Sequence, residues 1–216
     1  MLKVFIIVEG RTEKTFADRL LGPDLAQKGI CIQPVILTTR TLPAGEKIRG
    51  GLPPYSRIRR EVLALLGDSS AACVTSMLDF YGLRSDFPGK TAAGRVGVQE
   101  VEAAWKNDIG DSRFLPYLSM HEFEALLFSD PEILAREMGK PGYVEKLSAI
   151  RQEFATPEDI NDRRETAPSW RLRRLFPDFE KPLHGPQIAS RIGLRRLRAE
   201  CPHFNDWVTR LESMAA

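Results

Sequence analysis

The sequence predicts an α/β fold, in which a mostly parallel sheet of about four strands is flanked by helices and has a helical C-terminal half packed on it. Apolar, β-rich runs alternate with helical patterns in the first half of the chain, an order typical of parallel strands joined by right-handed crossovers. Strand signals then end, while helical spacing continues. Because no linker separates the two parts, we expect one compact unit, with an α/β core over residues 1–128 and a helical extension over residues 129–216.

The composition limits the classes of protein to which the chain can belong. With 216 residues and 43% apolar side chains, it can bury a substantial core without disulfides. Its three cysteines lie far apart, which offers no pair at metal-ligand spacing and favours a reducing compartment. No apolar run approaches the ~20 residues that cross a bilayer, and the first run ends too early for a signal peptide. We therefore expect a cytoplasmic protein.

The first strand is predicted over residues 2–8, a continuous apolar run that suits a central strand covered on both faces. The helix that follows has an apolar stripe around Phe16 and can be capped by Thr12. Residues 31–37 predict a second strand. Residues 38–54 are rich in Thr, Gly and Pro and predict a long loop.

A second helix and two more strands complete the predicted core. Helical spacing of apolar residues begins at Tyr55, and residues 71–78 predict a third strand that stops at Asp79. A helix around Trp105 then leads to a fourth strand over residues 114–118.

The C-terminal half has helical patterns alone. Helices are predicted over residues 122–128, 131–138, 143–154, 187–197 and 204–211. The last is the clearest, because Phe204, Trp207, Val208 and Leu211 fall at i, i+3, i+4 and i+7.

Carboxylates follow two strands of the predicted sheet where each strand ends. Glu9 directly follows the first strand, Glu13 lies in the first turn of the next helix, and Asp79 ends the third strand. The carboxyl ends of parallel strands share one edge of a sheet, so these side chains should meet there. Carboxylates so close repel unless a cation lies between them, and Mg²⁺ or Mn²⁺ prefers such oxygen ligands. The alternative is a helix-capping glutamate and a structural turn aspartate.

A third acidic contribution comes from the segment that begins at His121. Glu122 and Glu124 are two residues apart, so on a helix they diverge, and we expect one of them to face the site. His121 and Glu122 begin a zincin-like motif, but Ala125 stands where its second histidine belongs. His121 can therefore be a ligand, a general base or an ordinary polar residue of a first turn.

The loop after Asp79 has further charged candidates. Residues 89–91 read Gly-Lys-Thr, but a phosphate-binding P-loop needs glycine at position 84, where the chain has Arg84. Arg84 and Lys90 could instead hold a phosphate, and Asp86 could supply another metal ligand. A solvated loop is the slightly favoured alternative.

Basic side chains supply candidate contacts to phosphate groups. The net charge of +2 is too small to predict nucleic-acid binding, but arginines gather over residues 57–60, 163–174 and 191–198. The candidates for substrate binding are Arg11, Arg84, Lys90, Arg171, Lys181 and His184. The sequence alone favours a different interpretation of the arginine clusters, as solvated helix faces paired with local Asp and Glu.

Five segments carry a family resemblance: VEGRTEKTF, MLDFYGLRSDFPG, LPYLSMHEFEALLFSD, PEDINDRRETAPSWRL and LHGPQIASRIGLRRLRAECPHFNDW. Together they resemble a bacterial Toprim-like family, the DUF4276 domains of unknown function. This family is similar to the Toprim fold of topoisomerases, primases and overcoming-lysogenization-defect nucleases. The resemblance to the family covers nearly the whole chain, and that to Toprim proper covers about the first half.

The resemblance implies a set of metal ligands. In Toprim enzymes a glutamate after the first strand and an Asp-x-Asp after the third bind magnesium together, and Glu9 and Asp79 match the glutamate and the first aspartate. The second aspartate position holds Tyr81. A further ligand must therefore come from Asp86, Glu122 or Glu124.

These features predict a divalent-metal-dependent phosphodiesterase or nuclease that acts on DNA or RNA. Mg²⁺ or Mn²⁺ would be held by Glu9, Asp79, Glu124 and Asp86, and the catalytic set would be Glu9, Glu13, Asp79, His121, Glu122 and Glu124. The resemblance also implies a partner ATPase in a system of the phage-defence type. The alternative is a non-catalytic, Toprim-like binding or regulatory subunit of an ATPase complex, which the loss of an aspartate at Tyr81 favours.

Overall fold

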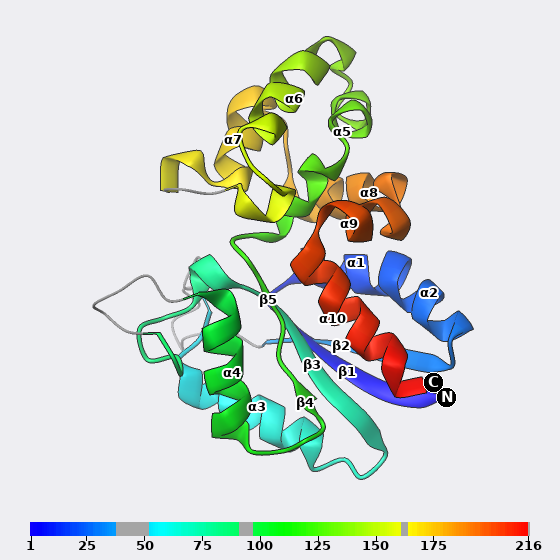
Figure 1. The fold of residues 1–216 in the computed structure, drawn as a ribbon, viewed down its shortest axis with the longest axis vertical. Helices are drawn as coiled ribbons and strands as arrows, with labels where there is room; N and C mark the ends of the chain where they lie inside the picture. The colour runs from blue at the N-terminus through cyan, green and yellow to red at the C-terminus, as the bar shows by residue number, and fades with distance from the viewer. Residues whose placement is uncertain (38–51, 91–96, 161–163, 216) are drawn as a thin grey trace, which may run out of the picture.

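The computed structural model describes residues 1–37, 52–90, 97–160 and 164–215. Most of the predicted loop over residues 38–54 lies outside these ranges, as do Thr91 and Arg163. Within them, the chain forms an α/β part and a helical part, arranged one above the other in Figure 1.

The expected α/β class is confirmed, because five parallel strands form one sheet in the described residues. The strands are β1 (Leu2–Val8), β2 (Ile30–Ile36), β3 (Ala71–Asp79), β4 (Phe114–Leu115) and β5 (Leu118–Ser119). Their order is β2-β1-β3-β4, and β5 also pairs with β3. The long strands β1 and β3 are therefore neighbours at the centre of the sheet.

The predicted fourth strand is divided in two by Pro116, which has no backbone N–H to donate. Side chains of β3 replace part of the ladder at the break. The Ser76 hydroxyl donates to the carbonyl of Tyr117 at 2.8 Å and accepts the N–H of Tyr117 at 2.9 Å. The Thr75 hydroxyl donates to the carbonyl of Leu115. These bonds keep the chain in register until it resumes as β5.

Helices cover both faces of the sheet (Figure 1). On one face lie α3 (Tyr55–Leu66) and α4 (Val98–Ile109). On the other lie α10 (Pro202–Glu212) and a continuous helical segment made of α1 (Arg11–Phe16), the π-helical turn Ala17–Leu21 and α2 (Gly22–Gln27). Each face has its own apolar cluster, as the uninterrupted apolar run of β1 predicts.

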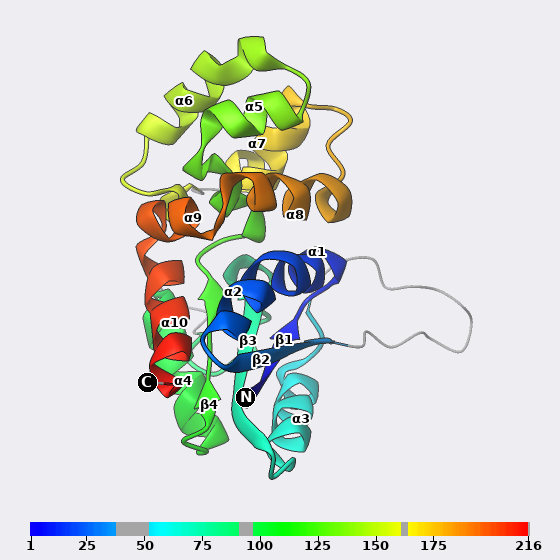
Figure 2. The same ribbon diagram turned by 90° about the vertical axis from the view of Figure 1, so that its right-hand side faces the viewer.

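The helical part contains α5 (Pro131–Glu137), α6 (Val144–Gln152), α7 (Pro168–Leu175), α8 (Lys181–Ile192) and α9 (Leu194–Glu200). Short 3₁₀ turns lie at Phe80–Gly82, Phe123–Ser129, Pro141–Tyr143, Pro157–Asp159, Arg164–Thr166 and Ser213–Ala215. Figure 2 shows α8 and α9 as a layer between α1 and the upper helices α5 to α7. The start of α8 is therefore brought towards the edge of the sheet.

Three predictions for the helical part are wrong in detail. Residues 122–128 were expected to be α-helical, but Phe123–Ser129 is a 3₁₀ helix. The single helix expected over residues 187–197 is two helices, since Gly193 has a φ of +83° and ends α8. Helix α7 and the first turns of α8 were not predicted, because Pro168 and Pro182 stand at their starts. Proline is compatible with the first turn of a helix, where its missing N–H has no intrahelical partner.

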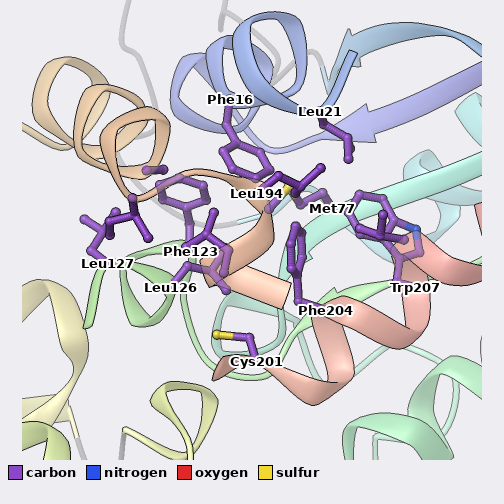
Figure 3. Packing of buried hydrophobic residues seen from close by; sticks show 14 of the residues in the cluster. Phe16, Leu21, Met77, Phe123, Leu126, Leu127, Leu194, Cys201, Phe204 and Trp207 are labelled. Carbon is purple, nitrogen blue, oxygen red and sulfur yellow. The ribbon is translucent and has the colours of Figure 1, made fainter. Parts of the chain in front are cut away.

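One apolar cluster joins the sheet to the helical part. Figure 3 shows Phe16, Met77, Phe123 and Phe204 converging from segments far apart in the sequence. The ring centroids of Phe16 and Phe123 are 5.3 Å apart in an edge-to-face arrangement. None of the helices in the described part of the chain has the length and apolar character needed to span a bilayer.

Candidate active site

Glu9 and Glu13 are positioned by the junction between β1 and α1. Glu9 is the first residue after the strand, and Gly10 is the N-cap of the helix. Glu13 Oε2 accepts the backbone N–H of Gly10 at 3.0 Å, so this carboxylate also caps the helix. Glu13 is 3% exposed. Both carboxylates therefore lie at the carboxyl edge of the sheet.

Asp79 reaches the same edge from the neighbouring strand. β1 and β3 run in parallel with Val8 opposite Met77, so Glu9 and Asp79 leave the sheet together. Asp79 Oδ1 accepts the backbone N–H of Phe123 at 2.9 Å, which ties the strand to the 3₁₀ helix after β5. Its other oxygen faces Lys181.

Glu122 and Glu124 point in different directions, as their spacing predicts. Glu124 is fully buried, and its Oε2 lies 3.1 Å from Lys181 Nζ. Glu122 Oε2 accepts the backbone N–H of Ser169 at 2.9 Å, at the start of α7. Glu124 therefore joins Glu9, Glu13 and Asp79 in what we call the acidic cluster, while Glu122 holds a helix of the upper layer.

Lys181, the first residue of α8, places its ammonium group among these carboxylates. Lys181 Nζ lies 3.1 Å from Glu124 Oε2, 3.2 Å from Asp79 Oδ2 and 3.9 Å from Glu13 Oε1. In the described residues, no other cation forms an ion pair with a carboxylate of the acidic cluster. The cluster thus has more negative groups than one lysine can neutralise.

Burial raises the pKa of every carboxyl group in the acidic cluster. For Glu9, desolvation and then the nearby Asp79 charge raise the pKa from its ordinary value of 4.5 to about 7. Desolvation raises the pKa of Glu124 to about 8, against the opposing effect of Lys181. It also raises the pKa of Glu13 and Asp79. Burial alone would lower the pKa of Lys181, but Asp79 and Glu124 raise it well above its ordinary value, so the lysine stays charged.

The chemistry of the donors fits a hard divalent cation. Glu9 Oε2 and Glu124 Oε1 are buried without a hydrogen-bond partner in the described structure, and the contact of Glu124 Oε2 is the ion pair with Lys181 Nζ at 3.1 Å. A buried carboxylate that lacks donors is costly unless a cation compensates it. In the present arrangement, no three acidic, imidazole or thiol groups of the described residues converge closely enough to hold a metal ion. Lys181 supplies the positive charge there instead.

His121 and Tyr81 lie on the two segments that follow β5 and β3, and the charged neighbours of the His121 ring are Asp159 and Glu122. Burial lowers the pKa of His121, which keeps the imidazole neutral near pH 7. The backbone carbonyl of His121 accepts the N–H of Tyr81 at 3.3 Å. Tyr81 is 49% exposed, so its ring stands at the surface where the resembled family has a second aspartate. The 3₁₀ turn after β3 lies against Glu9, because a Cβ on Gly82 would be 3.7 Å from Glu9 Oε2.

Asp86 is not brought into the acidic cluster. Its Oδ2 accepts the backbone N–H of Tyr55 at the start of α3, and its Oδ1 lies 3.8 Å from Arg84 Nε. Lys90 Nζ donates to the carbonyls of Phe80 and Leu83, at 3.2 and 2.8 Å. Lys90 therefore stabilises the turn after Asp79, and Arg84 remains on the exposed surface of the loop.

Of the three remaining candidates, Arg11 lies on the segment that carries Glu9, and Arg171 and His184 make contacts within the helical part. Arg11 is exposed at the start of α1, next to Glu9. Arg171 donates to the carbonyl of Thr166 at 2.8 Å and lies over the Phe154 ring, within the upper helices. His184 Nδ1 accepts the N–H of Glu180 and so caps α8.

Some arginines of the three clusters form ion pairs with carboxylates, although several of these partners are distant in the sequence. Pairs in the described residues include Arg59 with Asp108, Arg171 with Glu153, Arg191 with Glu137, Arg196 with Glu200 and Arg198 with Glu212. In these pairs the arginine charge is directed to a carboxylate of the protein and not to the phosphate groups of a nucleic acid.

Sequence reasoning missed how Lys181 enters the acidic cluster. The lysine is 102 residues from Asp79, and no local pattern indicates which helix begins over the sheet edge. Gly185 could have indicated that this segment packs closely against another element. A Cβ there would lie 3.2 Å from Phe123 Cε1 and 3.3 Å from Thr12 Cγ2, so this glycine lets α8 pack closely on α1.

Comparisons with known proteins bear on the chain as a whole. Residues 8–212 match the model of a family described as Domain of unknown function (DUF4276). Among solved structures, the chain is similar to the C-terminal region of the Burkholderia pseudomallei OLD protein, with a TM-score of 0.48, 14% sequence identity and 100% of each chain covered. A comparison with curated proteins gives no match.

Proposed function

The chain belongs to the DUF4276 family, whose model spans residues 8–212, and from the site that it carries we propose that it is a divalent-metal-dependent phosphodiesterase acting on DNA or RNA. One observation carries this proposal. Four carboxylates from three separate segments, three of them buried and Glu9 half-buried, gather at the carboxyl edge of a parallel sheet, and Glu9 Oε2 and Glu124 Oε1 have no hydrogen-bond partner in the described structure. Such an arrangement is unfavourable for a structural role and suits a cation site.

Glu9, Asp79 and Glu124 are the residues that would hold Mg²⁺ or Mn²⁺, with Glu13 beside them. The bound ion would supply Lewis-acid activation of a phosphodiester. His121, neutral because burial lowers its pKa, would accept a proton at a ring nitrogen in this proposal. Asp79 is held in place by the N–H of Phe123.

Basic groups around the acidic cluster would bind the nucleic-acid backbone. Arg11, two residues after Glu9, and Arg84, in the loop after Asp79, are exposed, and Lys181 lies within the cluster. Contacts of this kind place a phosphodiester without reading bases. A partner ATPase and a phage-defence setting are further parts of this proposal and rest on the family resemblance. A cytoplasmic location is also proposed, on the three widely separated cysteines, which favour a reducing compartment.

Glu9→Gln and Asp79→Asn test the nuclease directly. The purified protein is incubated with plasmid, single-stranded DNA and RNA in Mg²⁺ or Mn²⁺, and cleavage is followed on gels. We expect cleavage by the wild type and a loss of at least ~100-fold in each variant, because each removes a ligand charge. Asp24→Asn, at an exposed carboxylate of α2 paired with Lys28, is the matched control and should keep full activity. Equal cleavage by wild type and both variants would contradict the proposal.

A second candidate is a non-catalytic binding or regulatory subunit of an ATPase. Tyr81, at the position of the second aspartate, favours it, as does the ion pairing of the acidic cluster to Lys181. Substrates that stay intact with and without the partner ATPase, together with stable binding to that ATPase, would support this candidate over the enzyme.

A further inference from the structure

We propose that Lys181 is a tethered cation that competes with the divalent ion for the acidic cluster, holding the metal-free site together and leaving it when the ion binds. This inference rests on the proposed function, since it assumes that the cluster binds a metal. According to this inference, Lys181 lowers the affinity of the acidic cluster for the divalent ion.

The contacts of Lys181 place its charge where a shared ion would have to be. Its Nζ lies 3.1 Å from Glu124 Oε2, 3.2 Å from Asp79 Oδ2 and 3.9 Å from Glu13 Oε1. An ion bound to the same oxygens at about 2.1 Å would lie within a few ångströms of the ammonium group. Two cations so close repel strongly inside a protein, so the lysine and the ion exclude each other.

The helix that carries Lys181 packs closely on α1, and the lysine side chain is partly exposed to solvent. Gly185 lies one turn further along α8, and a Cβ there would be only 3.2 Å from Phe123 and 3.3 Å from Thr12. The Lys181 side chain itself is 25% exposed, which gives its ammonium group a path to solvent. Lysine has a long, flexible stem that allows such a movement without a shift of the backbone.

The charges of the cluster explain why a tethered cation is useful. Four carboxylates in a buried site repel one another, and Lys181 is their only ion-pair partner in the described part of the chain. The lysine therefore stabilises the protein when no metal is bound. The same contacts oppose metal binding, because they must be broken before the ion can use those oxygens.

Lys181→Met tests the competition by a measurement that does not depend on cleavage. Calorimetric titration with Mg²⁺ or Mn²⁺ should give an affinity for the variant that is higher by roughly 10- to 100-fold, the effect of removing charge-assisted contacts that metal binding must break. In EDTA, the variant should melt at a lower temperature than the wild type. Lys14→Met is the matched control, since Lys14 pairs only with the exposed Asp18 on α1 and should change neither quantity appreciably.

A second measurement uses the wild-type protein, so it does not depend on the folding of a variant. Acetic anhydride acetylates accessible lysines, and mass spectrometry measures the extent at each site. We expect saturating Mg²⁺ or Mn²⁺ to increase acetylation of Lys181 several-fold and to leave Lys14 unchanged.

The outcomes separate this inference from the proposed function. The inference is wrong if the wild type binds the metal and Lys181→Met binds it equally well or more weakly. It is also wrong if the metal protects Lys181 from acetylation. Either result would contradict the competition but would still support a metal site. If neither protein binds a divalent ion, both the inference and the proposed function fail.

Discussion

Glu9 and Glu124 differ from the other two carboxylates of the acidic cluster in how their oxygens are satisfied. Asp79 accepts hydrogen bonds from Phe123 and Lys181, and Glu13 accepts one from Gly10. Glu9 Oε2 and Glu124 Oε1 have no hydrogen-bond partner among the described residues, and Glu124 Oε2 contacts Lys181 Nζ without any backbone donor. A bound cation would therefore gain most at Glu9 and Glu124, while Asp79 and Glu13 are already held in position by the backbone.

The raised pKa of Glu124 predicts a specific dependence of stability on pH. Its pKa is about 8 in the folded protein against an ordinary value of 4.5, so the folded state favours the protonated form. The stability that this group contributes is therefore fully present below about pH 4.5 and is lost as pH rises through about 8. Glu124→Gln imitates the neutral acid at every pH.

We expect the melting temperature of Glu124→Gln, relative to wild type in EDTA, to rise progressively from pH 5 to pH 9, since only the wild type must bury a charge at high pH. Thermal denaturation followed by circular dichroism measures this difference. A difference that stays constant over the whole range would show that burial of Glu124 does not govern its protonation.

Several site residues could be predicted from the sequence because each follows a strand directly. Glu9 and Asp79 needed only the order of strands and the rule that sites lie at their carboxyl ends. Asp86 and Lys90 could not be placed, because the direction of the loop after Asp79 depends on contacts with Tyr55, Phe80 and Leu83. The metal-binding and catalytic roles of all these residues stay predictions.

Among the elements, α8 is important for the site because it carries Lys181. The sequence did not predict the first turns of this helix. Pro182 and Pro186 made its first turns resemble a loop. Pro182 is tolerated because the first N–H groups of a helix have no intrahelical partner, whereas Pro186 costs one backbone bond that packing must offset. Tertiary contact at Gly185, not local propensity, explains why this segment is helical.

Gly185→Val should separate α8 from α1. Its side chain would meet Phe123 and Thr12, whose nearest atoms are 3.2 and 3.3 Å from the position of a Cβ. We expect a loss of about 1–3 kcal/mol in the free energy of unfolding, as is usual for overpacking. Urea denaturation measures it. Gly142→Val is the control, since no atom lies within 4 Å of a Cβ there, and a comparable loss in that variant would remove the packing explanation.

On the scale of the whole molecule, the sheet and the helical part share one apolar cluster. More than half of the buried residues in that cluster come after residue 128, including Phe204 and Trp207 of α10. Trp207 Nε1 donates to the buried hydroxyl of Thr75 in the central strand at 2.8 Å. The apolar cluster therefore includes residues of both parts, while the expectation of one compact unit and the boundary at residue 128 stay predictions.

A fragment of residues 1–128 should therefore not fold independently. It would lose Phe204, which packs on Phe16, and Trp207, and would expose part of one face of the sheet to water. We expect the fragment to show no cooperative thermal transition by calorimetry, in contrast to the full chain. A sharp transition with native-like near-ultraviolet circular dichroism would instead establish the α/β core as an autonomous domain.

The bond between Trp207 and Thr75 also has a consequence for biosynthesis. A ribosome releases β1 and β3 long before α10, so one side of the nascent sheet stays uncovered until translation of this segment is nearly finished. Apolar surface exposed for that time invites aggregation. The sheet can therefore complete its packing only after α10 has left the ribosome.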